Sequence, residues 1–478
     1  MYKLHLILKY LAKRRIAWVS LIAVTLCTAL VLVVISVMGG WLRMARQSFH
    51  GLAGDVIITS RSLSGFAHYQ EFVREVQKLP QVEAAVPVLR TFGLIKINNG
   101  NPDAVQVLGY PVEQIGRVNN FPQSLHRQYE APLSAGQAPP APSFNLVPGK
   151  DYKELASYRL PKARGAENWP GMIVGAGVVG ISKDKDGNID RPAGLLDAFV
   201  RLEVMGLSGE EISLETARPT PNYYWIVDDS RTQMWQLDSK TVYVAFDVLQ
   251  QDLRMAERST TNPDTGEKIV RPARTTDIYI KARPDADLEK LKEDVTRIVA
   301  ARYPLVLEPD APIAVQTWEE TNRTWLGAIE KEKSLVTFLF GMISIVAVFQ
   351  IFCIFYMIVV EKTRDIGIIK SIGATSRGVA GIFLGYGLVI GVVGSLMGLG
   401  VGFLIVHYIN EIHTALGKLT GTVIWNPEVY AFDVIPNTMN PNEVFWIVLI
   451  AILSSVLGAL VPAIRAAGMH PVDSLRWE

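Results

Sequence analysis

The chain has 478 residues, of which 49% are hydrophobic, and its formal net charge is +1. This charge balance gives no reason to expect nucleic acid as a partner. The mean hydropathy of +0.22 is higher than a soluble protein of this length usually has, so membrane-spanning segments are expected. The two cysteines, Cys27 and Cys353, lie inside apolar runs, which excludes a disulfide framework and a cysteine metal site.

Four segments are long and apolar enough to cross a bilayer, which takes about 20 residues. No charged residue lies in the core of any of them, which argues against a proton relay or an ion-coupled carrier. The sequence therefore predicts transmembrane helices over residues 16–40, 334–360, 379–407 and 443–464.

The short segments outside these spans differ in their lysine and arginine content. Such residues recur in the tail 1–15, in the loop 361–378 and in the tail 465–478, whereas the loop 408–442 holds one lysine. Cytoplasmic segments carry the excess of positive charge. We therefore predict a multi-pass inner-membrane protein with both termini and the loop 361–378 in the cytoplasm, and the loop 408–442 outside.

The external region, 41–333, is large enough to form its own core in the periplasm. Strand and helix patterns at both ends, 41–121 and 249–333, predict one α+β part split by an insertion. Each end is also helical beside the membrane, either as an ordinary interfacial helix or as a stalk that carries motion. Within the insertion, the Pro-rich and Ala-rich stretch 122–170 predicts an exposed loop, and 171–248 predicts a small β subdomain.

The loop 361–378 carries a patterned, charged helix. Ile366, Ile369 and Ile372 are three residues apart, which predicts one apolar face. The residues expected to stabilise the two ends of this helix are Thr363, Asp365, Lys370 and Gly373. From the pattern alone, such a helix either rests on membrane lipid or fills a groove in a protein, and lipid is the simpler option.

The third span carries a stripe of glycines. At about 100° per residue, five of them fall on one side of the helix. They are Gly387, Gly391, Gly394, Gly398 and Gly402. Small residues at this spacing let helix backbones touch, so we predict a packing face, either within the chain or against a second subunit.

The motifs of several enzyme classes are absent from the sequence. No G-x-x-x-x-G-K-[ST] segment occurs, so the chain has no phosphate-binding loop of its own, and neither H-E-x-x-H nor G-x-S-x-G is present. The segment "DKDGNID", 184–190, resembles part of a calcium loop, but Ser182 and Ala193 would then take two of the ligand positions. An Asp-Gly hairpin turn is favoured there. We therefore expect no catalytic residue, metal site or cofactor in this chain.

The segments "VVEKTRDIGIIKSIGAT" and "IFLGYGLVIGVVGSLMGLGVGF" resemble the membrane subunits of the MacB-like (FtsX-like permease) ABC transporter superfamily. The likeness extends to "LILKYLAKRRIAWVSLIAV" near the start and "PAIRAAGMHPVDSLRWE" at the end, and the lipoprotein-releasing (Lol) permeases are the most similar branch. The resemblance implies four transmembrane helices and a periplasmic α+β domain with a ferredoxin-like part split by a small β subdomain.

The resemblance also implies that the loop helix is a coupling helix, which docks on a separate ABC ATPase subunit that binds ATP and Mg. The residues that correspond to this contact are Glu361, Lys362, Arg364, Asp365, Ile366, Gly367, Lys370 and Gly373. Permeases of this family work as pairs, so a second permease subunit, identical or paralogous, is a further expected partner.

By the same resemblance, the chain passes ATP-driven motion to its periplasmic domain and releases lipoproteins from the inner membrane, with a periplasmic lipoprotein carrier as a further partner. A hairpin near residues 207–222 corresponds to the carrier-docking position. Three alternatives are a MacB-like exporter of another client, an FtsX-like regulator of an envelope hydrolase, and a membrane receptor without an ATPase. The large external region argues against the regulator.

Overall fold

The computed structural model describes residues 15–98, 100–125, 142–147, 150–159, 165–183, 189–190, 194–205, 220–232, 234–261, 268–302, 313–420 and 435–470. The chain divides into two compact units. The helical unit comprises Met1–Met44, Trp325–Ile424 and Val434–Glu478, and the α/β unit comprises Ala45–Thr324 and Trp425–Asp433.

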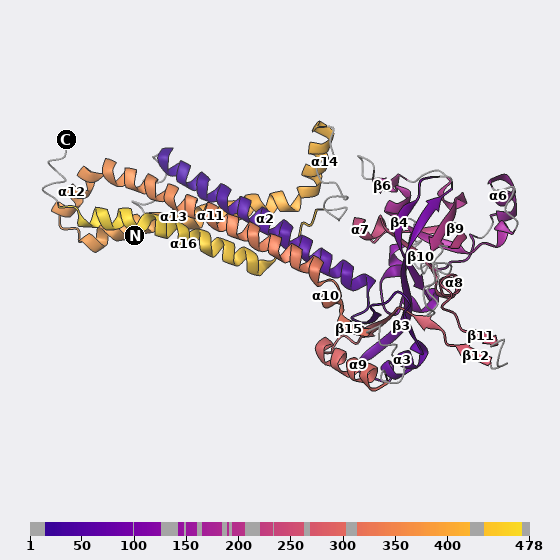
Figure 1. Ribbon diagram of the computed structural model, residues 1–478. Helices are drawn as coiled ribbons and strands as arrows, with labels where there is room; N and C mark the ends of the chain where they lie inside the picture. Colours follow the sequence, from indigo (N-terminus) through magenta and orange to yellow (C-terminus); the bar gives the residue numbers. More distant parts are fainter. Residues whose placement is uncertain are drawn as a thin grey trace, which may run out of the picture. The chain divides into compact units, whose positions relative to one another are not determined.

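Four long helices build the helical unit (Figure 1). They are α2 (Arg15–Leu52), α11 (Arg323–Glu361), α13 (Ser376–His407) and α16 (Pro441–Gly468). Each is long and apolar enough to cross a membrane. Helices suit such segments because all backbone hydrogen bonds are then made inside the segment, where lipid offers no partner. Both α2 and α11 exceed the predicted spans, because each continues as helix into the residues of the α/β unit.

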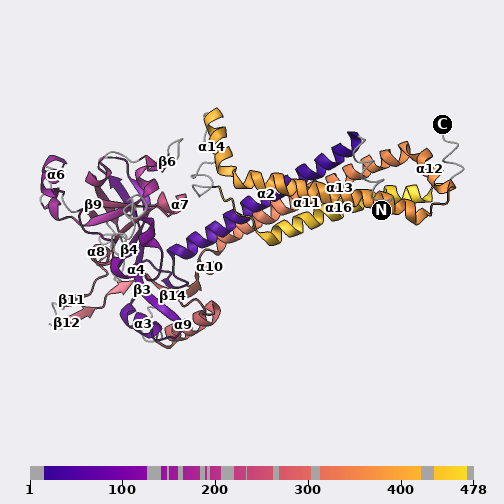
Figure 2. The ribbon, with the colours of Figure 1, turned by 180° about the vertical axis from the view of Figure 1, so that it is seen from behind.

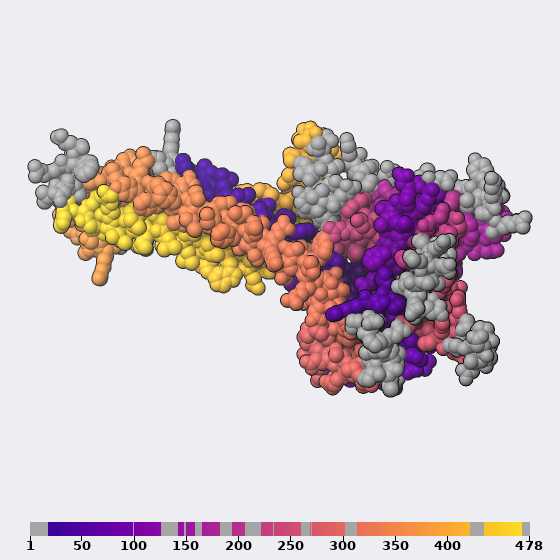
Figure 3. Space-filling model, in the orientation of Figure 1, coloured from indigo at the N-terminus to yellow at the C-terminus, as the bar shows by residue number. Residues whose placement is uncertain are grey.

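Two shorter helices complete this unit. The helix expected in the loop 361–378 is α12 (Thr363–Ser371), between α11 and α13. A second one, α14 (Ile409–Thr420), follows α13 in a segment that the sequence predicted only as a loop. Figure 3 shows α11 (orange) and α16 (yellow) side by side along the unit, where a Cβ on Gly458 of α16 would lie 2.9 Å from Ile351 Cγ2 of α11.

The α/β unit contains a four-stranded antiparallel sheet in the order β15-β1-β14-β3. Its strands are β1 (Val56–Ser60), β3 (Val82–Ile97), β14 (Asp277–Ala282) and β15 (Ile313–Thr317), and its helices are α3 (Tyr69–Val76) and α9 (Leu288–Arg302). The helices cover one face, where Phe72 and Leu291 pack in one core with Ile58 and Ile280 of the sheet. The chain order β1-α3-β3 and β14-α9-β15 is a β-α-β-β-α-β pattern with a long insertion between its halves.

The second half of β3 belongs to a closed barrel (Figure 2). The other barrel strands are β4 (Asp103–Tyr110), β5 (Gly171–Gly175), β8 (Phe199–Val204), β9 (Thr220–Ser230) and β10 (Thr241–Ala245). They run in the order β3-β4-β10-β5-β9-β8, and β8 pairs back onto β3. Closure removes the exposed edges of the sheet. Val107, Met172, Leu202 and Val242 fill the interior.

The remaining elements are short. They are β2 (Phe66–Ala67), α4 (Val112–Ile115), η1 (Phe121–Ser124), α6 (Tyr152–Arg159), η2 (Ala166–Asn168), η3 (Ala176–Val179), β6 (Ser182–Lys183), β7 (Ile189–Asp190), η4 (Leu195–Asp197), α7 (Trp235–Asp238), α8 (Phe246–Asp252), β11 (Arg258–Thr261), β12 (Lys268–Arg271), β13 (Arg274–Thr275) and α10 (Trp318–Thr321). Strands β6 and β7 pair antiparallel, and β7 is the end of the segment "DKDGNID". Residues 184–188 of this segment lie outside the described residues.

The boundaries of the insertion differ from those predicted. The sequence assigned residues 41–121 to the split α+β part, but β4 and the end of β3 are barrel strands. The 16-residue strand β3 is long enough to pair in two sheets at once, with β14 near its start and with β4 further on. The β subdomain is thus completed by strands from the preceding segment.

The stretch 122–170 is not simply an exposed loop. Tyr152 and Ala156 of α6 are buried in a cluster with Trp225 of β9, and the indole Nε1 of Trp225 donates a 2.7 Å hydrogen bond to the Ala166 carbonyl. The expectation of exposure is therefore wrong for this part. In the sequence, the short apolar pattern of α6 is obscured by the Pro-rich and charged residues around it, so the helix was not predicted. Residues 126–141 lie outside the described residues.

Asp55 ties together the segments that meet at the end of α2. Its buried carboxylate accepts a hydrogen bond from His50 Nε2 of α2, a 2.7 Å hydrogen bond from the Ala282 N–H, and an ion pair from Lys281 Nζ at 3.2 Å. Its own carbonyl accepts a 3.1 Å hydrogen bond from the N–H of Trp318, the first residue of α10. One residue thus joins α2, the end of β14 and the turn that leads to α11: its side chain contacts the first two and its backbone carbonyl the third.

We expect Asp55→Asn to lower the free energy of unfolding by about 2 kcal/mol, because charged hydrogen bonds to a buried group are lost. Burial raises the pKa of Asp55, but the hydrogen bonds and the Lys281 charge outweigh it and hold the pKa below its ordinary value of 3.8. The stabilisation is therefore complete above that value and is lost as the pH falls through the lowered pKa.

Urea unfolding of the full chain in detergent, followed by tryptophan fluorescence at neutral pH and near pH 3, measures this difference. Asp285→Asn is the matched control, because Asp285 is exposed in the turn after β14. If Asp55→Asn were no more destabilising than the control at neutral pH, Asp55 would not have the role described.

Candidate functional site: the α12 helix

The start of α12 is set by a break directly after α11. Lys362 separates the two helices with φ −100° and ψ 12°, and its ammonium pairs with Asp365 in the first turn of α12. The sequence predicted that the hydroxyl of Thr363 accepts a hydrogen bond from an N–H at the start of the helix, and this prediction is wrong. The hydroxyl donates instead to the carbonyl of Val360 in α11 at 2.8 Å. Thr363 thus binds α12 back to the preceding helix.

The end of α12 is a tight turn. The helix ends at Ser371, and Gly373 has a φ of +105°, in the region that glycine occupies without strain. The left-handed cap predicted for Gly373 is therefore present. The turn allows α13 to begin at Ser376, with Thr375 as its N-cap residue.

One face of α12 is anchored on the ends of the three long helices. Ile366 is only 4% exposed and packs in a small core with Val359 of α11, Val379 of α13 and Ala466 of α16. On the same side, Lys370 Nζ donates to two carbonyls at the end of α16, those of Ala467 at 2.8 Å and Met469 at 2.6 Å. A cation on these carbonyls satisfies acceptors that the helix end leaves open.

We expect Lys370→Met to lower the free energy of unfolding of the helical unit by about 1 kcal/mol, because the terminal carbonyls of α16 lose their donor while the aliphatic stem is kept. Thermal unfolding of the full chain in detergent measures the loss. Lys370→Arg, which keeps the charge, is expected to restore most of it. Equal stability of the methionine and arginine variants would contradict this contact.

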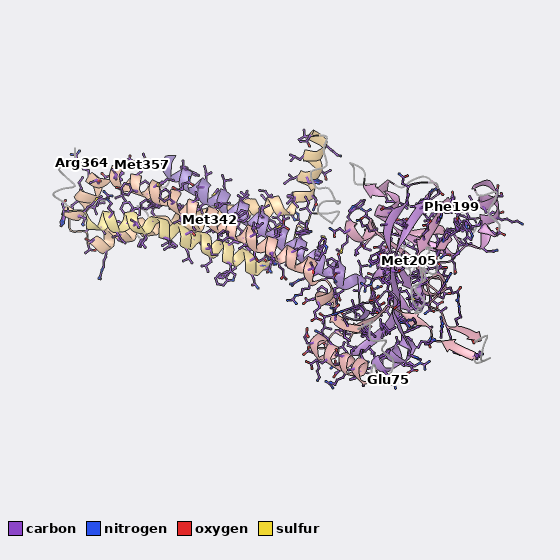
Figure 4. The ribbon with its side chains drawn as sticks, in the orientation of Figure 1. Glu75, Phe199, Met205, Met342, Met357 and Arg364 are labelled. Atoms are coloured by element: carbon purple, nitrogen blue, oxygen red, sulfur yellow. The ribbon has the colours of Figure 1, made fainter. Side chains whose placement is uncertain are left out.

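The opposite face of α12 points away from the helical bundle. Arg364 is exposed at its end, as Figure 4 shows, and Ile368 is 43% exposed. Ile372, in the turn after the helix, is 82% exposed. Arg364, Ile368 and Ile372 are spaced by four residues and form a line that we call the outer stripe.

The prediction that Ile366, Ile369 and Ile372 share one face is therefore wrong at its last member. Each step of three residues falls short of a full helical turn by about 60°, so two steps rotate the side chain by about 120°. Ile372 also lies beyond the last residue of the helix. A four-residue reading of the same segment would have found the outer stripe.

The eight residues that the resemblance assigned to ATPase docking lie in different environments in the structure. Glu361 and Arg364 are exposed, Ile366 and Gly367 are buried, and Lys370 bonds to α16. Lys362 and Asp365 form an ion pair, and Gly373 forms the turn. Their docking role remains a prediction. Ile368 and Ile372 were not among the eight, although both are more exposed than Ile366.

The glycine stripe of α13 lies in the interior of the helical unit. All five glycines are buried. Gly387 and Gly391 face Ser455 of α16, whereas Gly394, Gly398 and Gly402 face α2. The packing seen here is thus within the chain.

Hydrogen bonds accompany this close packing. Ser455 Oγ donates to the Gly387 carbonyl at 3.0 Å, and Thr25 Oγ1 of α2 donates to the Gly394 carbonyl at 3.2 Å. Such bonds form across helices whose backbones approach closely at small residues. The stripe therefore holds α2 and α16 on α13, and α12 rests on this assembly.

The chemistry available at α12 is that of a binding surface. The outer stripe offers one guanidinium and two aliphatic side chains on a helix with an anchored inner face. Among the residues that the structure describes, no three His, Cys, Asp or Glu side chains come together as metal ligands.

Residues 337–471 match the FtsX-like permease C-terminal family. The chain contains an FtsX-like permease domain. This domain takes in most of α11 and all of α12, α13, α14 and α16, so the candidate surface lies within it.

Similar proteins extend the likeness beyond this permease domain. The lipoprotein-releasing system transmembrane protein LolC of Neisseria meningitidis is 24% identical over 98% of both chains, and that of Xylella fastidiosa is 22% identical over 98% of both. The macrolide export ATP-binding/permease protein MacB of Bdellovibrio bacteriovorus is 26% identical over 42% of this chain and 28% of its own.

Among solved structures, the periplasmic region of MacB from Actinobacillus actinomycetemcomitans aligns with 57% of this chain and 94% of its own. The sequence identity is 7% and the TM-score is 0.27. These values are too low for an argument about fold or function.

Proposed function

We propose that this protein is the membrane subunit of an ABC transporter in an inner membrane, with its α/β unit in the periplasm. The FtsX-like permease domain and the likeness to LolC over nearly the whole length support this proposal. The chain itself would be non-catalytic, and a separate ATPase subunit would bind ATP and Mg.

The arrangement of α12 carries the proposal. A helix whose inner face is anchored on α11, α13 and α16 moves together with them. Its outer stripe has the form of a helix that fills a groove in a partner, with apolar side chains at four-residue spacing and a cation at one end. A helix that rests on lipid would place its apolar side chains toward the membrane. In α12, the buried Ile366 packs instead on the ends of α11, α13 and α16.

The long helices offer a path along which ATP-driven motion of the ATPase would reach the α/β unit. Both α2 and α11 continue without a break from residues of the helical unit into residues of the α/β unit. We propose that they act as stalks, and that the split β-α-β-β-α-β part is the ferredoxin-like domain that receives the movement. Asp55 would link this part to the end of α2.

The proposed client is a lipoprotein of the inner membrane, by the likeness to LolC. A carrier-docking hairpin near 207–222 remains part of the proposal, but residues 206–219 lie outside the described residues. A second permease subunit would pack on the exposed apolar side chains of α11, which include Phe338, Met342, Ile345 and Phe349.

A MacB-like exporter of another periplasmic client is the second candidate, because the similarity to MacB of Bdellovibrio bacteriovorus covers 42% of this chain. The two functions differ in the client and share the ATPase. Depletion of the protein in its native host distinguishes them. Lipoproteins should accumulate in the inner membrane under the first function and should be sorted normally under the second.

Affinity purification of the tagged full chain from native membranes tests the class. We expect an ATPase with a phosphate-binding loop and a permease subunit to co-purify. Recovery of the chain without any nucleotide hydrolase, under conditions that preserve a control ABC complex, would contradict the proposal.

A further inference from the structure

The helix α14 is amphipathic and is not packed into the helical unit. Its sequence, INEIHTALGKLT, places Ile409, Ile412, Leu416 and Leu419 within an arc of about 80° on one side. None of its residues is buried, and Leu416 is 45% exposed. The other side carries Glu411, Thr414 and Lys418.

Aromatic residues mark the level at which α14 begins. α13 ends at His407, and Tyr408 is the one residue between the two helices. α16 starts at the same end of the bundle, with exposed Phe445 and Trp446 in its first turns. Tyrosine and tryptophan gather where membrane spans reach the headgroups.

Charged side chains lie at this same end. Lys333 Nζ of α11 and Glu443 Oε1 of α16 form an ion pair at 2.9 Å, and the Arg43 guanidinium of α2 donates to the Thr438 carbonyl at 2.9 Å. Residues on three of the four long helices thus indicate one polar boundary at this end of the helical unit.

The direction of α14 is held by a pair of hydrogen bonds. Asn410 Nδ2 donates to the Ile435 carbonyl, and the Ile435 N–H donates to Asn410 Oδ1, both at 3.1 Å. Figures 1 and 2 show that α14 turns steeply away from the axis of α13. If α13 crosses the membrane, a helix that turns away in this manner at its end would run along the membrane surface.

We propose that α14 is a membrane-binding helix that lies in the outer leaflet interface, with Ile412, Leu416 and Leu419 among the lipid acyl chains and Lys418 at headgroup level. The apolar face of α14 contacts lipid rather than protein, because the helix directly follows a membrane span at the level of the headgroups. An amphipathic helix in this position buries its apolar face roughly 5–10 Å into the headgroup–acyl boundary. The inference rests on the proposed membrane location of the four helices, and it does not depend on ATPase docking.

Site-specific fluorescence quenching tests this. Cys27 and Cys353 are replaced by alanine in the full chain, and a single cysteine labelled with NBD is placed at one of three positions. They are Leu416→Cys, Thr414→Cys as the matched polar-side control, and Ile450→Cys as a membrane control on an exposed position of α16. Each protein is reconstituted in phosphatidylcholine–phosphatidylglycerol vesicles, with and without lipid that carries a nitroxide near the carbonyl end of the acyl chain.

The expected result is that the probes at 416 and 450 lose most of their fluorescence to the nitroxide lipid, whereas the probe at 414 keeps most of it. Quenching at 450 without quenching at 416 would overturn the inference about α14 alone. This holds even if the probe at 416 were shielded from water, because a protein would then cover it. Absence of quenching at 450 as well would overturn the membrane location, and the inference with it.

Discussion

Gly398→Val is expected to disrupt the helical unit, whereas Gly400→Val in the same helix should leave it intact. A Cβ on Gly398 would lie 2.7 Å from the Thr25 carbonyl oxygen and 2.7 Å from Thr28 Cβ, both on α2. The first of these atoms is backbone, so relief requires α2 and α13 to separate. A Cβ on Gly400 meets nothing within 4 Å.

The expected loss for Gly398→Val is about 3 kcal/mol of unfolding free energy, at the upper end of what overpacking usually causes. Separation of the helices would also break the hydrogen bond from Thr25 to Gly394. Because both variants place valine in the same helix, the change in intrinsic helix propensity is matched. Thermal unfolding in detergent, followed by circular dichroism, measures the difference. Similar melting temperatures for the two variants would show that α2 does not pack on α13 at this glycine.

The double variant Arg364→Glu and Ile368→Asp is expected to abolish functional coupling to the ATPase while leaving the chain folded. Both side chains belong to the outer stripe and lie outside the small core that anchors α12. Central contacts of an interface are each worth about 2 kcal/mol, so the pair should weaken ATPase binding by roughly 1,000-fold.

Binding of the separately purified ATPase to the chain in lipid nanodiscs measures this effect, together with stimulation of ATP hydrolysis. Arg297→Glu in α9 is the control, because it repeats the charge change of Arg364→Glu at an exposed residue of the α/β unit. Ile368→Leu should retain binding. A double variant that bound the ATPase as well as the Arg297→Glu control does would remove the outer stripe from the interface.

The sequence indicated the elements whose signal is local. A membrane span is defined by its own composition, and a glycine stripe is visible from spacing alone, so the four spans and the five packing glycines could be found before the structure. The partners of the glycines could not. Small residues permit a close approach without specifying which helix makes it.

Features that depend on distant residues were missed. The barrel closes through pairs such as Gly93 with Val204, which are far apart in the chain. No local pattern encodes such a pairing. On α12, the spacing predicted an apolar face, but only the positions of Val359, Val379 and Ala466 decide which isoleucine is buried. α14 was missed because its short apolar pattern follows a much stronger one.

The proposed function requires that α12 lies in the cytoplasm and contacts an ATPase. Labelling of Ile372→Cys, in the chain without its native cysteines, tests both points, because this residue belongs to the outer stripe and is 82% exposed. A membrane-impermeant maleimide should label it in inverted inner-membrane vesicles and not in intact spheroplasts, and bound ATPase should protect it. Labelling from outside the spheroplasts, or labelling in vesicles that the ATPase leaves unchanged, would contradict the proposed function.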